Sequence, residues 1–296
     1  METTDKEINI AEQRKSTRRA AMMLGGTALA GLALGRTVFA QSAVTDADIL
    51  NFALNLEYLE AQFYTLATAG KTIDQAGVGI TGPNGTSGGM VTVKSNPAVP
   101  FQTPLLQQFA AELAADEQNH VTFLRSALAS SAVAMPNIDL ENSFNALASA
   151  AGLGSSFDPF LNETNFLLGA FIFEDVGVTA YLGAAGLISS ATYLDKAAGI
   201  LAVEAYHAGS IRTRVFQAGA PAQAAATKIA AARASLDGTG NDDIGVGVND
   251  GAATTVDADS NGLAFSRTTT QVLKVVYGGG SSSGAFFPKG LNGTIK

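Results

Sequence analysis

The sequence predicts an all-α protein, an antiparallel four-helix bundle with a Gly-rich loop inserted between its first two helices and an irregular C-terminal extension. Three observations support this prediction. Apolar residues in the first long segment recur at three- and four-residue steps, as on the buried face of a helix. Two later helical segments each carry the pattern Glu-x-x-His. Stretches rich in Gly and Pro separate the helical segments from one another.

The composition is that of a globular protein with a sizeable core, and its charge argues against a nucleic-acid partner. The chain has 296 residues, of which 47% are hydrophobic and 15% charged, and it contains no Cys. Six of its 18 basic residues lie in the first 40 positions, which leaves 12 basic against 22 acidic residues in the remainder. Nucleic-acid phosphates are bound by clustered Lys and Arg, which this acidic body lacks.

Residues 1–40 are predicted to be a secretory signal. A basic start is followed by an apolar run over 20–34 and by small residues up to Ala40. The run is shorter than the roughly 20 residues of a membrane-spanning helix, so a permanent anchor is the weaker interpretation. Arg18 and Arg19 resemble the pair of a bacterial twin-arginine (Tat) signal. The resemblance implies export by the Tat machinery, cleavage after Ala40 and a periplasmic or extracellular location.

The first helix of the mature chain is predicted to begin at Thr45 and to run to Gly70. Thr45 and Asp48 have the spacing of a capping box, in which each side chain accepts a hydrogen bond from the backbone of the other residue. From position 70 to 104 the composition changes to Gly, Pro, Thr and Asn, which indicates an inserted loop. Within this loop, 90–93 is a candidate short strand.

The rest of the bundle is predicted from further helical segments. Their expected ranges are about 105–130, 140–150, 158–188, 191–218 and 222–236. The bundle domain therefore covers 41–236, with its insertion at 70–104. Residues 237–296 are rich in Gly, Asn, Asp, Ser and Thr and are expected to pack on the bundle as an extension rather than to form a second core.

One stretch of the extension imitates a calcium-binding loop. Residues 257–262 read Asp-Ala-Asp-Ser-Asn-Gly, like the opening of an EF-hand loop. The twelfth position is Thr268, where that loop needs a bidentate Glu, and the next segment does not read as a helix. An Asp- and Asn-rich turn is the better interpretation.

The two histidines of the chain are the first candidates for metal ligands. His120 follows Glu117 by three positions, and His207 follows Glu204 in the same way. Three steps on a helix turn about 300°, so each Glu and its His project from one face within reach of one metal ion. A single Glu-x-x-His is a weak signal. Two copies that use both histidines, each on a long predicted helix, favour a metal site.

The helices before these two pairs carry a matching feature, so the chain contains an internal two-fold repeat. Glu57 precedes Tyr64 by seven positions, and Glu174 precedes Tyr181 by seven. The insertion at 70–104 accounts for most of the longer spacing in the first repeat. We expect the two tyrosine hydroxyls to hydrogen bond to ligand carboxylates from outside the site.

Charge balance connects these six residues with a pair of metal ions. Four carboxylates turned into the core of a bundle are costly unless cations neutralise them, and two divalent ions cancel the four charges. No Lys or Arg lies within 46–69 or 158–188 to do so instead. Carboxylate and imidazole ligands suit Fe or Mn, with Zn as a further option. Glu60 lies close to the centre of the apolar stripe and is an alternative ligand to Glu57.

The remaining acidic residues near these motifs do not repeat. They are interpreted as surface groups, helix caps or groups that contact the ligands from outside: Glu112, Asp116, Glu163 and Asp175.

With this ligand pattern, residues 45–218 resemble the ferritin-like superfamily of di-iron and di-manganese bundles. Residues 54–64, 272–278 and 284–295 are further similar to desiccation-related, ferritin-like domain proteins. The resemblance implies an oxidoreductase that acts on peroxide or dioxygen, catalase-like or a ferroxidase with Fe(II) as substrate, in stress or desiccation protection. It also implies that Glu117 and Glu204 bridge two metals.

Two alternatives to this enzyme remain. The protein can be a non-enzymatic stress or structural protein with a structural or vestigial metal site, or a hydroxylase on the same bundle, for which no positive feature is present. The insertion and the extension are expected to prevent a 24-subunit ferritin shell, which leaves a smaller homo-oligomer open.

Overall fold

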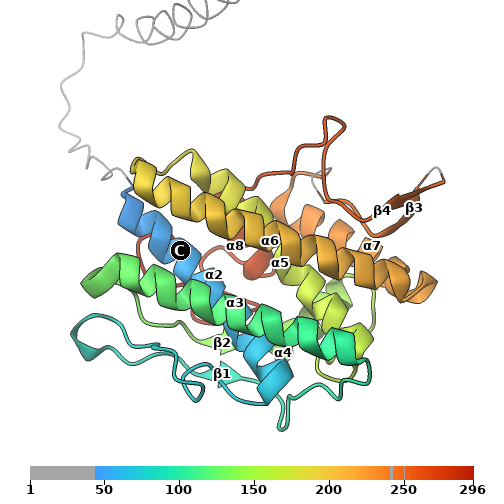
Figure 1. Ribbon diagram of the computed structural model, residues 1–296, viewed down its shortest axis with the longest axis horizontal. Helices are drawn as coiled ribbons and strands as arrows, with labels where there is room; N and C mark the ends of the chain where they lie inside the picture. The colour runs from blue at the N-terminus through green and yellow to red at the C-terminus, as the bar shows by residue number, and fades with distance from the viewer. Residues whose placement is uncertain (1–43, 241–242, 250) are drawn as a thin grey trace, which may run out of the picture. The chain divides into compact units, whose positions relative to one another are not determined.

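The computed structural model describes residues 44–240, 243–249 and 251–296 (Figure 1). The signal predicted for 1–40 lies outside the described residues. Four long helices form the bundle, and the all-α prediction is confirmed. Helix α2 packs along α3, α5 packs along α6, and α2 also contacts α5. Their bounds are α2 Asp46–Ala69, α3 Pro104–Leu128, α5 Glu163–Ala185 and α6 Ala191–Gln217.

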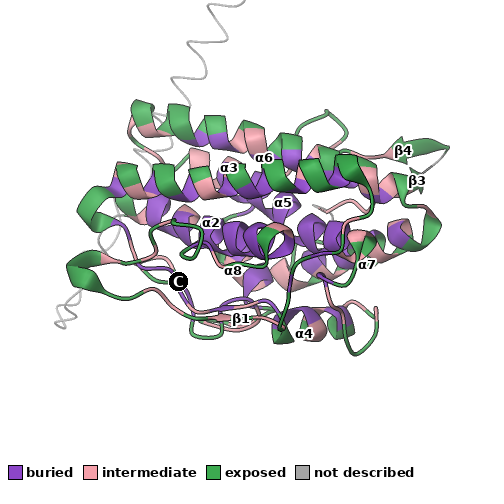
Figure 2. Ribbon diagram, turned by 60° about the horizontal axis from the view of Figure 1, so that its bottom comes forward, coloured by how far each residue is buried: buried purple, intermediate pink, exposed green. Residues whose placement is uncertain are grey.

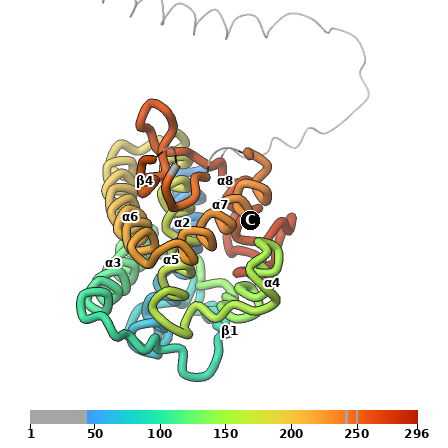
Figure 3. Tube along the Cα trace, turned by 90° about the vertical axis from the view of Figure 1, so that its right-hand side faces the viewer, coloured from blue at the N-terminus to red at the C-terminus, as the bar shows by residue number. Residues whose placement is uncertain are grey.

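Helices α2 and α5 form the centre of the protein (Figure 3). Both are buried along most of their length, whereas α3 and α6 bury one stripe each and expose the other face (Figure 2). A helix that is hydrophobic all round belongs in a core. By length and composition, α5 is the one described helix apolar enough to cross a membrane, and its burial marks it as a core helix instead.

Helix α2 begins where it was predicted to begin, whereas helix α5 begins five residues later than predicted. Thr45 and Asp48 form the capping box, and Gly70 ends α2 at a positive φ of 64°. Helix α5 begins at Glu163 rather than near 158. Asp158 instead accepts the backbone N–H of Phe160 and closes a turn, while the side chain of Asn162 caps the helix. The Asp-Pro pair at 158–159 therefore marks a turn before the helix.

The insertion between α2 and α3 is tied to the connection that follows α3. Strand β1 (Val91–Thr92) lies in the predicted position and pairs in parallel with β2 (Ile138–Asp139). The side chain of Arg125 donates to Thr81 O and to Tyr58 Oη, which anchors the inserted loop on α3 and α2. The remaining elements here are the 3-10 turns η1 (Pro83–Gly85) and η2 (Ala129–Ser131) and helix α4 (Asn142–Ala150).

The C-terminal part packs on α5 and α6, on the side away from α3 (Figure 3). Helix α7 (Ala220–Asp237) is followed by a hairpin of β3 (Gly247–Asn249) and β4 (Ala252–Thr254). The prediction that no helix follows Thr268 is wrong, because α8 (Thr269–Val276) starts there with a capping box of Thr268 and Gln271. The Gly-rich composition on both sides of these eight residues argued against a helix. Asp259 accepts from the backbone of Asn261 and Leu263, which confirms the predicted turn.

A buried group of ion pairs joins the bundle to the segment after α7. Asp175 of α5 accepts from Arg212 of α6 at 2.9 Å and from Arg233 of α7 at 2.8 Å. Arg233 and Arg267 both contact Asp243 as well. The side chain of Asp175 is thus buried among arginines rather than being a surface group, a cap or a contact of the site ligands, and the interpretation from sequence is corrected. Its partners lie 37 and 58 positions away in the chain, so local spacing did not indicate them.

Candidate metal site

The side chains predicted to bind metal meet in the middle of the bundle, and all of them are buried. Glu57 of α2, Glu117 of α3, Glu174 of α5 and Glu204 of α6 are fully inaccessible, and His120 and His207 are 8% and 5% exposed. Each of the four long helices contributes one glutamate. The periodicity that buries the apolar face of each helix therefore also carries its glutamate into the core.

The ligand atoms fall into two overlapping groups, as expected for two adjacent metal positions. Within each group, the candidate atoms all lie within 4.8 Å of one another. Glu117 and Glu204 belong to both groups, which is the arrangement that two bridging carboxylates require. The first group is Glu57, Glu117, His120 and Glu204, and the second is Glu117, Glu174, Glu204 and His207.

Each imidazole directs Nδ1 toward the carboxylates. His120 Nδ1 lies 3.2 Å from Glu57 Oε2 and 3.6 Å from Glu204 Oε1. His207 Nδ1 lies 3.2 Å from Glu117 Oε1 and 3.4 Å from Glu174 Oε2, without the geometry of a hydrogen bond. The two rings face each other across the site, with centroids 6.4 Å apart.

Unpartnered polar atoms show that these residues suit a metal. Buried polar atoms are nearly always hydrogen bonded, and exceptions call for an explanation. In the described residues, both carboxylate oxygens of Glu117 and of Glu204, one of Glu174 and Nδ1 of His207 are buried and have no hydrogen-bond partner. Oxygen and imidazole nitrogen are the donors that Fe, Mn and Zn take. Two divalent cations in this cluster would pair all of these atoms and cancel four negative charges.

The two tyrosines of the repeat hold the outer oxygens of two of these glutamates. Tyr64 of α2 donates to Glu174 Oε1 of α5 at 2.5 Å. Tyr181 of α5 donates to Glu57 Oε1 of α2. Each half of the repeat therefore orients a carboxylate of the other half, and the remaining oxygen of each glutamate points to the site. Burial and the neighbouring carboxylates raise the pKa of both tyrosines well above the ordinary value, which keeps their hydroxyls protonated as donors.

Glu60 lies beside the site but belongs to neither group of ligand atoms. It is 5% exposed. Burial and the charges of Glu117, Glu174 and Glu57 raise its pKa well above the ordinary value. Gly177, which sequence reasoning did not single out, leaves the space for Glu204: a Cβ there would lie 3.1 Å from Glu204 Cδ and would clash with Oε2.

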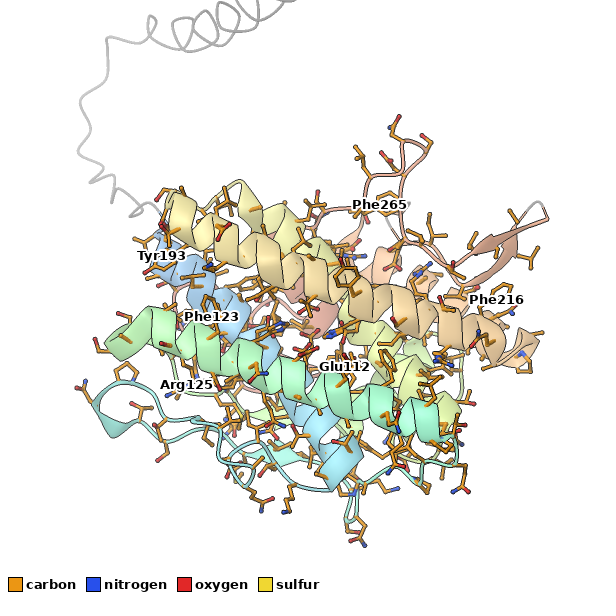
Figure 4. All side chains as sticks on the ribbon, viewed as in Figure 1. Glu112, Phe123, Arg125, Tyr193, Phe216 and Phe265 are labelled. Carbon is orange, nitrogen blue, oxygen red and sulfur yellow. The ribbon has the colours of Figure 1, made fainter. Side chains whose placement is uncertain are left out.

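A surface groove of mixed polar and apolar lining runs along the two helices that carry the histidines. It lies between α3 and α6, has a volume of about 630 Å³ and is lined by Glu112, Tyr206 and Arg214 among others. Figure 4 labels Glu112 on α3 beside this groove. One turn further along α3, Asp116 Oδ2 lies 3.2 Å from His207 Nε2, and its side chain is 39% exposed. Asp116 thus orients His207 from outside the ligand group.

A four-helix bundle with this buried cluster of glutamates and histidines suggests a di-metal carboxylate site. The comparisons with known proteins agree on the family. Residues 45–217 match the ferritin-like domain family, and the chain belongs to it.

Two relatives align over most of both chains. The chain is 30% identical over 268 residues to the desiccation-related protein PCC13-62 of Craterostigma plantagineum. This alignment covers 84% of this chain and 83% of the relative. The chain is also 26% identical over 269 residues to the ferritin-like catalase Nec2 of Nesocodon mauritianus. This alignment covers 84% of each of the two chains. No solved structure matches the chain significantly. The likeness to desiccation-related and ferritin-like proteins was predicted from residues 54–64 and from the C-terminal segments, and it is confirmed.

Proposed function

We propose that this ferritin-like protein is an exported di-metal oxidoreductase that acts on hydrogen peroxide, as a catalase-like enzyme with Mn or Fe. The observation that carries the proposal is the pair of overlapping ligand groups, in which the oxygens of Glu117 and Glu204 have no hydrogen-bond partner among the described residues. The similarity to a ferritin-like catalase favours peroxide as the substrate. The twin-arginine-like pair Arg18 and Arg19 is the basis for proposing export.

The side chains would divide the work as follows. Glu57 and His120 would hold one metal position, Glu174 and His207 the other, and Glu117 and Glu204 would bridge them. Bound Mn or Fe ions supply the change of oxidation state that lets one peroxide be reduced to water while another is oxidised to dioxygen. Two peroxide molecules give two waters and one dioxygen, so no outside reductant is needed.

The surrounding side chains support this reaction by orienting the ligands. Tyr64 and Tyr181 fix the carboxylates of Glu174 and Glu57, and Asp116 fixes the ring of His207. Such outer contacts hold ligands in place, and their loss lowers metal affinity. The groove between α3 and α6, the helices that carry the histidines, would be the approach for peroxide.

The test is dioxygen evolution from hydrogen peroxide by the mature protein loaded with Mn(II) or Fe(II). We expect turnover in the wild type and its loss in Glu117→Gln, which removes a bridging charge but keeps the shape of the side chain. Glu141→Gln, the same change at an exposed glutamate that belongs neither to the ligand groups nor to the groove, is the matched control and should keep full activity. A metal-loaded wild type without peroxide turnover would contradict the proposal.

A dioxygen-dependent ferroxidase is the second candidate, because the same ligand set serves Fe(II) oxidation. It predicts consumption of dioxygen by the Fe(II)-loaded protein and no evolution of dioxygen from peroxide. The similarity to a desiccation-related protein favours a third role, a non-enzymatic stress protein with a structural metal site. That role predicts metal-dependent stability without turnover of either oxidant.

A further inference from the structure

Two adjacent apolar cavities lie between the surface and the residues beside the candidate metal site, away from the groove between α3 and α6. The outer cavity has a volume of about 110 Å³ and lies between α4, α7, α5 and α8. The inner cavity, of about 20 Å³, lies between α2, α5 and α8. Ile172 of α5 and Val275 of α8 line both cavities, so these two side chains stand between them.

The outer cavity reaches the surface and is apolar within. Ala150 and Ser235 in its wall are exposed, whereas Phe144 and Ile172 are buried. Apart from Ser235, its one polar lining side chain is Arg233, whose guanidinium is already hydrogen bonded to Asp175, Asp243 and the carbonyl of Phe171. The cavity therefore offers little to a polar solute.

The inner cavity ends at Glu60 and Gly177, which lie beside the candidate metal site. Of its lining residues, Glu60 carries the one polar side chain, and the others include Leu59, Phe173, Val176 and Phe286. A Cβ on Gly177 would meet both Glu204 and Glu60 Oε1, the latter at 3.5 Å. Glu60 and Gly177 are therefore the residues that separate this cavity from Glu204, which belongs to both ligand groups.

The small volume and apolar lining of the inner cavity favour a small apolar molecule over water. A buried water needs about 10–15 Å³ and two to four polar partners, and this cavity has the room but offers a single carboxyl group. Cavities of this kind stay dry and take up small apolar molecules. Its volume limits the occupant to about the size of a diatomic molecule.

We propose that these two cavities form the path by which dioxygen passes between the metal site and the surface. This inference rests on the proposed function, since dioxygen is the product of peroxide dismutation and the substrate of the ferroxidase alternative. Polar peroxide and water would use the groove between α3 and α6, and the apolar gas would use the opposite side of the bundle. The separation keeps substrate entry and gas transit from sharing one opening.

Dioxygen itself is the probe for this path, because it is paramagnetic and shortens the relaxation of methyl groups that it visits. The experiment compares methyl relaxation of the mature chain under argon and under dioxygen pressure, with a chelator present so that no other paramagnetic centre contributes. We expect dioxygen to enhance relaxation at Leu59, Ile172 and Val275 by about threefold or more over Ile211, because the gas partitions into apolar cavities. Ile211 is a fully buried residue that lines neither cavity. Equal enhancement at Leu59 and Ile211 would overturn the proposal.

A variant tests the order of the path. Ile172→Phe should remove the effect at Leu59 in the inner cavity and keep it at Leu147 in the outer one. The control is Ile188→Phe, the same enlargement in the wall of another small apolar cavity, which ends on Tyr181. It should leave the effect at Leu59 unchanged. If Ile188→Phe abolished that effect, or if Ile172→Phe did not, the proposed route would be wrong.

A second variant is available in case the first does not fold. If Ile172→Phe does not fold, Val275→Leu narrows the same passage with one added methylene group, and the same outcome is expected. The measurement requires neither bound metal nor turnover. A protein without peroxide activity but with dioxygen in both cavities would contradict the proposed function and support the path. A protein with peroxide activity but without dioxygen in the inner cavity would support the proposed function and contradict the path.

Discussion

Gly177→Ala is the smallest change that tests the arrangement of the ligands. The added methyl group would clash with Glu204 Oε2 and lie 3.1 Å from Cδ, inside ordinary van der Waals contact. The Glu204 carboxylate must then move by about 1 Å, and functional sites need their ligands within about 0.5 Å of the working geometry. Because Glu204 belongs to both ligand groups, binding at both metal positions should suffer.

The stability of the metal-free protein should change much less. Overpacking costs about 1–3 kcal/mol, whereas replacing a helical Gly by Ala gains about 0.8–1.0 kcal/mol. The net loss is therefore about 0–2 kcal/mol. Thermal unfolding with and without metal, together with the metal content per chain, separates these two effects.

A control variant isolates the effect of the clash. Gly199→Ala lies within α6, and a Cβ there has no neighbour within 4 Å. It should raise stability by about 0.8–1.0 kcal/mol through helix propensity alone and leave the metal content unchanged. If Gly177→Ala binds metal with the same stoichiometry and affinity as the wild type, the assignment of Glu204 as a bridging ligand is refuted.

Three further predictions follow from the same structure. The double variant of His120→Ala and His207→Ala should lose bound metal and all metal-dependent stabilisation, as measured by elemental analysis and thermal unfolding. In the metal-free wild type, the surrounding carboxylates raise the pKa of both histidines to about 11, so their stabilising contribution is complete below the unfolded pKa of about 6.5 and is lost as the pH rises toward 11. The thermal midpoint without metal should therefore fall between pH 7 and pH 10, and a constant midpoint would contradict this. Arg233→Met leaves Asp175 with one buried partner fewer and should cost about 3–5 kcal/mol, whereas Lys94→Met at a half-exposed ion pair should cost at most about 1 kcal/mol.

The sequence was sufficient for the bundle and for the buried cluster of glutamates and histidines because both depend on local periodicity. Helix α2 was predicted with its cap because Thr45 and Asp48 lie three positions apart. The pairs of Glu117 with His120 and of Glu204 with His207 were visible for the same reason, since three positions on a helix bring two side chains to one face.

The features that the sequence did not reveal depend on contacts between distant segments or on the absence of a side chain. The partners of Asp175 are brought to it by the packing of α6 and α7 on α5, which no local pattern encodes. Gly177 reads as an ordinary helical glycine until Glu204 is placed against it. Helix α8 has only eight residues, and the Gly-rich composition around it argued against a helix more strongly than its capping box argued for one.

The metal content of the mature protein, purified from its native compartment without added metal or chelator, tests the di-metal site most directly. We expect about two Fe or Mn ions per chain, one for each group of ligand atoms. Fewer than about 0.2 ions per chain, with no uptake on reconstitution with Mn(II), Fe(II) or Zn(II), would contradict the di-metal site, because four buried carboxylates without cations are costly.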